Sequence, residues 1–133
     1  MNWLFKEEPS NYSFDALVRD GRTSWTGVRN PLAQKHLKSV KKGDRIFFYH
    51  TGDEKAVVGI CRAAGPAYPD PNDKSCKLYA VDVEPVKKLK APVALSAIKA
   101  DRRFADLPLT RMPRLSVMPI SDDDWDAIVA MSQ

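Results

Sequence analysis

Two apolar runs on either side of a short polar turn constrain the fold of this chain more than any other feature. Residues 45–50 read RIFFYH and residues 56–64 read AVVGICRAA, with a polar segment at 51–55 between them. Aromatic and β-branched residues favour strands, and so short a connection joins antiparallel neighbours. Gly59 in the second run predicts a bulge or a bend, which small barrels use to curve a sheet. The sequence therefore predicts an antiparallel hairpin within a bent sheet.

Three further segments are predicted to be strands. Residues 2–6 (NWLFK) and 114–119 (RLSVMP) are short apolar runs. Residues 77–86 (KLYAVDVEPV) alternate apolar and polar side chains, which predicts a strand with one face in water. Residues 67–73 (AYPDPND) are predicted to be irregular, because their prolines remove backbone donors.

Capping residues mark the predicted helices. Ser13 is an N-cap for a helix that stops at Gly21, and Pro31 suits the first turn of a helix running to about Val40. Ser121, followed by three aspartates, caps a last helix in which Trp125 is predicted to be a core residue. Two short helices are expected near 95–100 and 103–107.

These elements predict one α+β domain over residues 1–133. Five or six strands would form a strongly bent sheet or barrel with short helices at its edges. Hairpin-connected strands argue against a doubly wound parallel sheet. Apolar residues make up 44% of the chain, but no apolar run is long enough to span a membrane. Lys6, Glu7 and Glu8 leave no room for a signal-peptide core, so we expect a cytoplasmic protein.

Cysteine and histidine are too sparse to build a metal site. Cys61 and Cys76 lie in no CxxC or Cys/His cluster, so both are predicted to be plain reduced thiols, one of them in a strand core. We therefore expect no metal and no cofactor.

The net charge of +4 lies entirely in the first half of the chain. Residues 1–66 hold 11 basic and 7 acidic side chains, whereas the remainder holds ten of each. On the helix after Pro31, Lys35, Lys38 and Lys42 share the face opposite the apolar one. These lysines are either a solvated face or a patch that attracts a polyanion.

Catalysis finds little support in the residues. His36 falls on the apolar face of its helix, which suits a structural histidine, and no nucleophile, phosphate-loop or zinc motif occurs. Glu7 and Glu8 are adjacent in a strand and so point to opposite faces. The aspartates at 122–124 are explained by capping.

Binding finds more support, in the segment WTGVRN at residues 25–30. An unstacked base is held by an aromatic face, by polar groups at its edge and by basic residues at its phosphate. Trp25, Glu8, Asn30 and Arg29 supply these groups, and Gly27 lets an irregular loop fold around a planar guest. The alternative is that Trp25 plugs the end of the barrel and Arg29 forms an ion pair with Glu8.

Seven stretches of the chain, in order, resemble the EVE domain family. They are WLFKEEP (3–9), WTGVRN (25–30), GDRIFFYHT (43–51), AVVGI (56–60), AYPDP (67–71), VDVEPVKKLKAPV (81–93) and RLSVMPIS (114–121). The resemblance implies a PUA-like mixed β-barrel with surrounding helices and no catalytic activity. It also implies binding of modified bases, notably 5-methylcytosine, in DNA or RNA.

Matched position by position, the resemblance implies a base-binding pocket. Its residues would be Trp25, Gly27, Val28, Arg29, Asn30, Lys6, Glu8, Pro9, Tyr49, His50, Leu115, Ser116 and Val117, with Arg29, Lys35, Lys38 and Lys42 at the phosphates. Two positions depart from the family pattern: Glu7 replaces a common serine, and Thr26 replaces a common aspartate. Glu8 would then take over the role of that aspartate, or another base would be preferred.

Three hypotheses for function follow. The first is a non-enzymatic domain, monomeric by default, that captures an extruded modified base such as 5-methylcytosine, best from single-stranded or distorted nucleic acid. The second is an RNA-binding module for RNA maturation or translation that is indifferent to modification. The third is a small enzyme that uses His50 with Glu8 on a nucleotide-like substrate.

Overall fold

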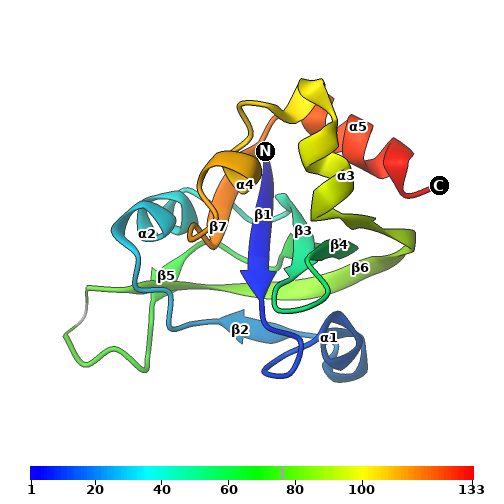
Figure 1. Ribbon diagram of the computed structural model, residues 1–133. Coiled ribbons are helices and arrows are strands. Elements are labelled where there is room, and N and C mark those ends of the chain that lie inside the picture. The colour runs from blue at the N-terminus through cyan, green and yellow to red at the C-terminus, as the bar shows by residue number, and fades with distance from the viewer. Residues whose placement is uncertain (76) are drawn as a thin grey trace.

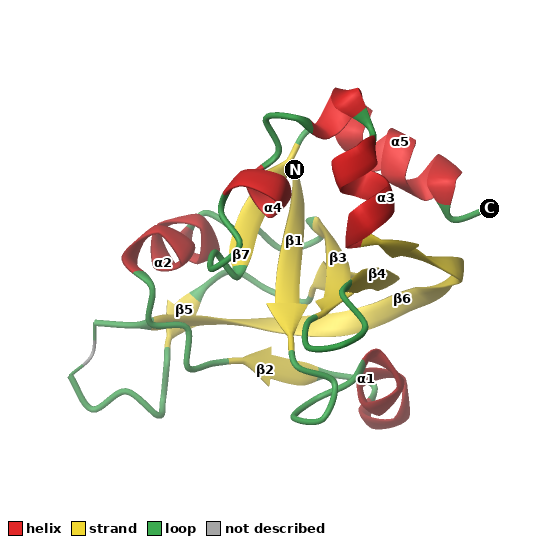
Figure 2. Ribbon diagram, in the orientation of Figure 1, coloured by secondary structure: helices red, strands yellow, loops and turns green. Residues whose placement is uncertain are grey.

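The predicted α+β architecture is confirmed in a computed structural model that describes residues 1–75 and 77–133. Across these residues a mixed, curled sheet carries short helices at its edges (Figures 1 and 2). Its strands are β1 (Asn2–Glu7), β2 (Thr23–Trp25), β3 (Arg45–His50), β4 (Ala56–Ala63), β5 (Tyr68–Pro69), β6 (Tyr79–Ala94) and β7 (Val117–Ile120). The order is β2-β6-β4-β3-β1-β7, with β5 paired to β6. Only the β1–β3 pair is parallel among the pairs in the described residues.

The predicted hairpin is the pair β3–β4, and the sheet is irregular around Gly59 of β4. The register shifts between Phe48 and Tyr49 on β3, and between Val57 and Gly59 where β4 meets β6. A Cβ added to Gly59 would lie 2.5 Å from the ring of Phe14. The glycine therefore lets Phe14, the first residue of the helix at 14–20, approach the sheet, and the register shifts beside it confirm the predicted bulge.

Three strand predictions need correction. β6 continues to Ala94 instead of ending at residue 86, because a register shift opposite Ile60 and Cys61 accommodates Pro85 within the strand. Tyr68 and Pro69 form a two-residue strand in a segment predicted to be irregular; at an edge, proline's missing donor is tolerated. The third correction concerns Trp25, which was predicted to lie in an irregular loop but is the last residue of β2.

The helices begin where the capping residues predict. They are α1 (Phe14–Asp20), α2 (Pro31–Lys38), α3 (Leu95–Ala100), η1 (Arg102–Phe104), α4 (Pro108–Arg111) and α5 (Asp122–Met131). Ser13 and Ser121 accept hydrogen bonds from backbone N–H groups within the first turn, and Gly21 ends α1 with φ 77°. The expected helix at 103–107 is replaced by η1 and α4. None of the helices in the described ranges is long and apolar enough to cross a membrane.

The core holds two of the three indoles in fixed polar or stacked contacts. Trp3 Nε1 donates to Asp44 Oδ2 at 2.9 Å. Trp125, a core residue as predicted, stacks on Phe47 with ring centroids 3.7 Å apart. Cys61 is a buried free thiol on β4, and burial raises its pKa, so it is unreactive. Cys76 lies outside the described residues.

Candidate functional site

The sequence predicted that Trp25 lies in an irregular loop. Trp25 is instead the last residue of strand β2. It pairs with Val81 of β6, and only 6% of its surface is exposed. Its ring lies 5.3 Å from that of Phe5 and 5.4 Å from that of Phe48, in tilted and edge-on geometries. Pairing with β6 makes residues 23–25 a strand. The sequence pattern does not predict it, because three residues are too few to show the alternation of apolar and polar side chains.

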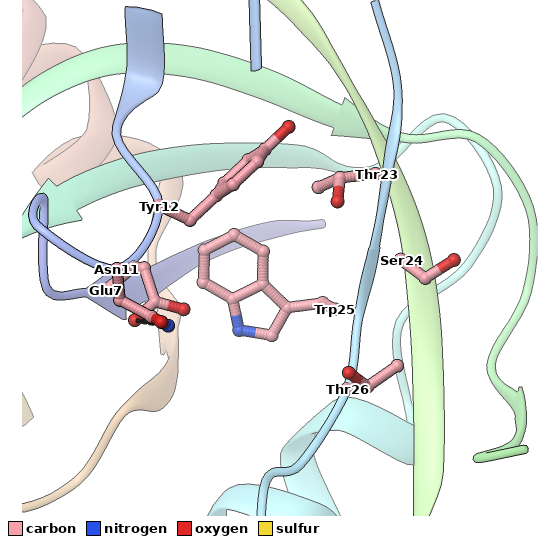
Figure 3. Close-up of a pocket in the computed structure, with 7 residues that line it drawn as sticks. All are labelled: Glu7, Asn11, Tyr12, Thr23, Ser24, Trp25 and Thr26. Atoms are coloured by element: carbon pink, nitrogen blue, oxygen red, sulfur yellow. Dashed lines mark hydrogen bonds between the residues drawn. The ribbon is translucent and has the colours of Figure 1, made fainter. Parts of the chain in front are cut away.

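A cleft of about 290 Å³ nevertheless opens beside the indole (Figure 3). It is lined by Glu7, Asn11, Tyr12, Thr23, Ser24, Trp25 and Thr26. Figure 3 shows the indole directed between Tyr12 and the side chains of Glu7 and Asn11, while the Ser24 hydroxyl turns away. The lining of the cleft is therefore mainly polar, with a small aromatic area from Tyr12 and from the exposed part of Trp25.

The indole N–H is available to a guest in this cleft. Within the described part of the chain, Nε1 of Trp25 donates to no protein atom, and no fully buried polar side-chain atom is left without a partner. The N–H therefore reaches solvent through the cleft. It can donate to an acceptor on a planar ligand.

Glu7 presents a free carboxylate oxygen on the same side. Its Oε1 accepts from the backbone N–H of Glu8 at 2.9 Å and from Asn11 Nδ2 at 3.2 Å. No described protein group donates to its Oε2. One oxygen thus fixes the carboxylate against the turn, and the other can accept a hydrogen bond from a guest.

The wall that carries Asn11 and Tyr12 is anchored to β3 through His50. The backbone N–H of Phe14 donates to His50 Nε2 at 3.0 Å, and His50 Nδ1 lies 2.7 Å from Glu54 Oε1. Nε2 must be unprotonated to accept, so Nδ1 carries the proton and donates it to Glu54. Both ring nitrogens are occupied, which leaves His50 no free nitrogen for the proton transfer that the third hypothesis requires.

The structure distributes the predicted pocket residues over three clefts and the core. Among the described residues in that prediction, Trp25 alone lines the cleft beside the indole. Lys6 and Tyr49 line a second cleft, and Asn30 and Leu115 line a third.

The remaining members of the prediction have structural roles or lie outside the Trp25 cleft. Val28, Leu115 and Val117 are buried in the core. Gly27 has φ 73°, and its N–H donates to Asp70 Oδ2 at 2.9 Å. Pro9 lies in the turn after β1, and the backbone carbonyl of Ser116 accepts from the N–H of Lys6.

Glu8 and Asn30, the two predicted readers of the base edge, face elsewhere. The Glu8 carboxylate packs against Gly52, where an added Cβ would lie only 2.5 Å from Oε2 of Glu8. Asn30 is the N-cap of α2, and its Oδ1 accepts from the N–H of Ala33 at 3.0 Å. Glu7, the last residue of β1, occupies the place in the Trp25 cleft that was assigned to Glu8, whereas Glu8 lies in the turn that follows the strand.

The predicted phosphate-contacting residues lie on and beside α2. Arg29, Lys35, Lys38 and Lys42 are all exposed. Lys38 Nζ lies 5.1 Å from the ring centroid of Tyr79. The suggested ion pair between Arg29 and Glu8 does not form in the described structure.

Asn11, Tyr12 and Thr23 line the cleft but were not predicted. Asn11 and Tyr12 fall in the turn between β1 and α1, where the N–H groups of both donate to the carbonyl of Glu8. The sequence KEEPSNYS at residues 6–13 does signal a turn before a capped helix. It gives no indication that the turn folds back beside Trp25.

Comparison with known proteins places the chain in a family. The family model described as the EVE domain matches residues 1–131. The chain belongs to the EVE domain family. Human thymocyte nuclear protein 1 is 26% identical over 166 residues, covering 99% of this chain and 74% of that protein.

Solved structures of EVE-like proteins superpose closely on this one. A Rhodopseudomonas palustris protein solved by NMR has a TM-score of 0.94 and 44% identity, covering 98% of this chain and 92% of its own. The human THYN1 protein in complex with 5-methylcytosine-containing DNA has a TM-score of 0.92 and 26% identity, covering 99% and 97%. The PUA-like fold implied by the resemblance is therefore confirmed.

The two positions at which the sequence is expected to depart from the family pattern lie in one place. Glu7 and Thr26 both line the cleft beside Trp25. They come from β1 and from the segment after β2, which are far apart in sequence.

Proposed function

We propose that this EVE domain binds nucleic acid and holds one extruded base in the cleft beside Trp25. The observation that carries the proposal is the combination of an indole with a free N–H and a carboxylate with a free oxygen in one cleft. The complex of the human THYN1 protein with 5-methylcytosine-containing DNA, which shares this fold, supports it.

The residues have separate roles in this mechanism. Tyr12 and the exposed part of Trp25 supply aromatic surface, and stacking of a base on such side chains stabilises single-strand complexes by about 1–3 kcal/mol. Oε2 of Glu7 accepts a hydrogen bond from the exocyclic amine of the base, the pairing that carboxylates make with cytosine. Glu7 takes the part that the sequence assigned to Glu8.

Magnitudes set the expected selectivity. A 5-methyl group buried against apolar surface adds about 1 kcal/mol, which corresponds to a preference of about tenfold or less. The domain would therefore favour the methylated base without excluding the plain one. Extrusion from a duplex costs a few kcal/mol, so single-stranded or distorted sites bind best.

Matched carboxylate variants test the assignment. Glu7→Gln removes the charge but keeps the shape and the acceptor for the Glu8 N–H. Because hydrogen bonds to charged groups contribute about 1.5–3 kcal/mol, it should weaken binding of a 5-methylcytosine single strand by roughly tenfold or more. Glu8→Gln makes the same chemical change outside the Trp25 cleft and should not weaken binding.

Fluorescence anisotropy with labelled oligonucleotides provides the measurement. Equal loss in both variants, or in neither, would remove Glu7 from the site. DNA and RNA strands with and without 5-methylcytosine distinguish the reader from the modification-indifferent RNA-binding module, since the latter should bind both RNAs equally and the DNAs weakly.

A further inference from the structure

A second cleft lies around the end of β1, and three lysines converge on it. Its volume is about 220 Å³. Lys6 of β1, Lys55 of the β3–β4 turn and Lys99 of α3 line it, over apolar surface from Leu95, Leu109 and Pro113. We call this group of side chains the basic cleft.

The positive charge of the basic cleft has little internal compensation. Nζ of Lys6 donates to the Pro113 carbonyl at 3.0 Å and lies 5.6 Å from the ring centroid of Tyr49. In the described structure none of Lys6, Lys55 and Lys99 forms an ion pair with a carboxylate. Burial lowers the pKa of Lys6, since the half-buried ammonium has lost water without gaining a counter-charge.

Acidic side chains lie near these lysines, and the Glu8 carboxylate packs against Gly52, which lines the basic cleft, but none of them forms an ion pair with Lys6, Lys55 or Lys99 in the described structure. Glu54 binds His50, and Glu8 accepts from the Ser10 hydroxyl. Asp53 lies with Lys55 and Lys99 around a neighbouring surface hollow, without an ion pair to either. An anion in the basic cleft would therefore meet three ammonium groups and offset the desolvation of Lys6.

The basic cleft and the Trp25 cleft share the carboxyl end of β1. Lys6 lines one and Glu7 the other, and adjacent strand residues point to opposite sides, with Cα atoms about 3.8 Å apart. Figure 1 shows this end of β1 at the turn that leads to α1.

We propose that the basic cleft holds a sugar–phosphate unit of the strand whose base occupies the Trp25 cleft. The apolar floor suits the sugar and the lysine rim suits the phosphate, the two groups through which proteins position a nucleic acid backbone. The proposal rests on the proposed function, and it adds Lys55 and Lys99 to the binding surface.

The salt dependence of binding tests this proposal. For single strands, each phosphate contact contributes about 0.7 to the slope of log K against log salt concentration. A 5-methylcytosine single strand is titrated by anisotropy into the intact chain and into the Lys55→Ala/Lys99→Ala double variant from low to moderate salt. Both lysines are exposed, so the double variant should fold normally, which its melting curve checks.

We expect the slope to fall by about 0.7 and the affinity at 0.1 M salt by about fivefold. Lys90→Ala is the matched control: Lys90 is exposed on β6 outside both clefts and should change neither quantity. An unchanged slope in the double variant, or an equal change in the Lys90 control, would overturn the proposal.

Three further outcomes separate the sources of failure. If the intact chain does not bind the strand at all, the proposed function itself fails. If Glu7→Gln weakens binding while the lysine variants do not, the base site stands and the basic cleft is excluded. Inorganic phosphate at matched ionic strength is the third probe: if it alone shifts the amide resonances of Leu95 and Lys99 while the oligonucleotide does not, the cleft takes a free anion and not the strand.

Discussion

Trp25 and Trp125 are both buried indoles, yet their surroundings differ in kind. Trp125 is 2% exposed and lies flat on Phe47, with the rings inclined by 14° and the Arg45 guanidinium 4.6 Å from its centroid. Trp25 is 6% exposed but meets Phe5 and Phe48 only in tilted or edge-on contacts, and it borders a cleft. The comparison teaches that ring geometry, more than exposure, separates a core indole from one that can also receive a ligand.

Truncating each indole should give the largest effects. Trp125→Ala and Trp25→Ala should each lower the free energy of unfolding by about 3–5 kcal/mol, since both remove a buried ring. At a temperature where both variants are folded, Trp125→Ala should bind a 5-methylcytosine strand normally and Trp25→Ala should not. Urea unfolding and anisotropy measure the two quantities, and loss of binding in both folded variants would erase the distinction.

Substitution of Gly59, which packs against Phe14, should give the next largest loss of stability. Gly59→Ala places a Cβ 2.5 Å from the Phe14 ring, and Phe14 packs edge-on against Phe48, which also contacts Trp25. Overpacking of this kind costs about 1–3 kcal/mol.

Gly65→Ala is its control, because a Cβ there meets nothing within 4 Å. Amide shift maps should show the disturbance of Gly59→Ala around Trp25 and not around Trp125. Equal stability of the two alanine variants would contradict the packing account.

Two asparagines extend the comparison to polar groups. Asn30→Ala should cost about 1 kcal/mol of stability by removing the N-cap of α2, whereas Asn30→Asp should retain it. Neither change should alter base binding strongly. Asn11→Ala should instead weaken binding, because Asn11 orients Glu7 in the Trp25 cleft. Thermal melts measure the stability of these variants, and anisotropy measures their binding. Strong loss of binding in Asn30→Asp would show that Asn30 contacts the base.

The smallest expected effect is a pH dependence that arises away from the Trp25 cleft. Burial, with the neighbouring Lys35 charge, lowers the pKa of His36, whose ring lies 6.2 Å from that of Trp3. The unfolded chain then binds the proton more tightly than the folded one. The contribution of neutral His36 to the free energy of unfolding is therefore fully present above about pH 6.5 and is lost as the pH drops toward the folded-state pKa. His36→Gln should flatten urea-unfolding profiles below pH 6.5, and an unchanged profile would assign the acid sensitivity to other groups.

Local signals predicted much of the fold. Ser13 and Ser121 marked helix starts because an N-cap satisfies N–H groups only two or three residues away, and Pro31 marked another because its fixed φ suits the first turn. The β3–β4 hairpin and the Gly59 bulge were likewise predicted from neighbouring residues. The extension of β6 past Pro85 and the short strands β2 and β5 were missed, because their backbone groups are paired by a partner strand and not by any local pattern.

The candidate site was predicted less well than the fold. Trp25 was singled out, but Glu8 and Asn30 were placed beside it, where the structure has Glu7, Asn11 and Tyr12. Family motifs fix which residue types are present, whereas the direction of each side chain depends on strand register. A shift of one residue along β1 exchanged the carboxylate that faces the cleft.

By itself, the sequence determined the class of fold, the caps, the hairpin and the family, since each depends on residues close together in the chain. Only the tertiary structure decided which polar groups meet. β1, the turn at 8–13 and β2 become neighbours through pairings with β3 and β6, and the alternation of side chains then sends Lys6 to one cleft and Glu7 to the other.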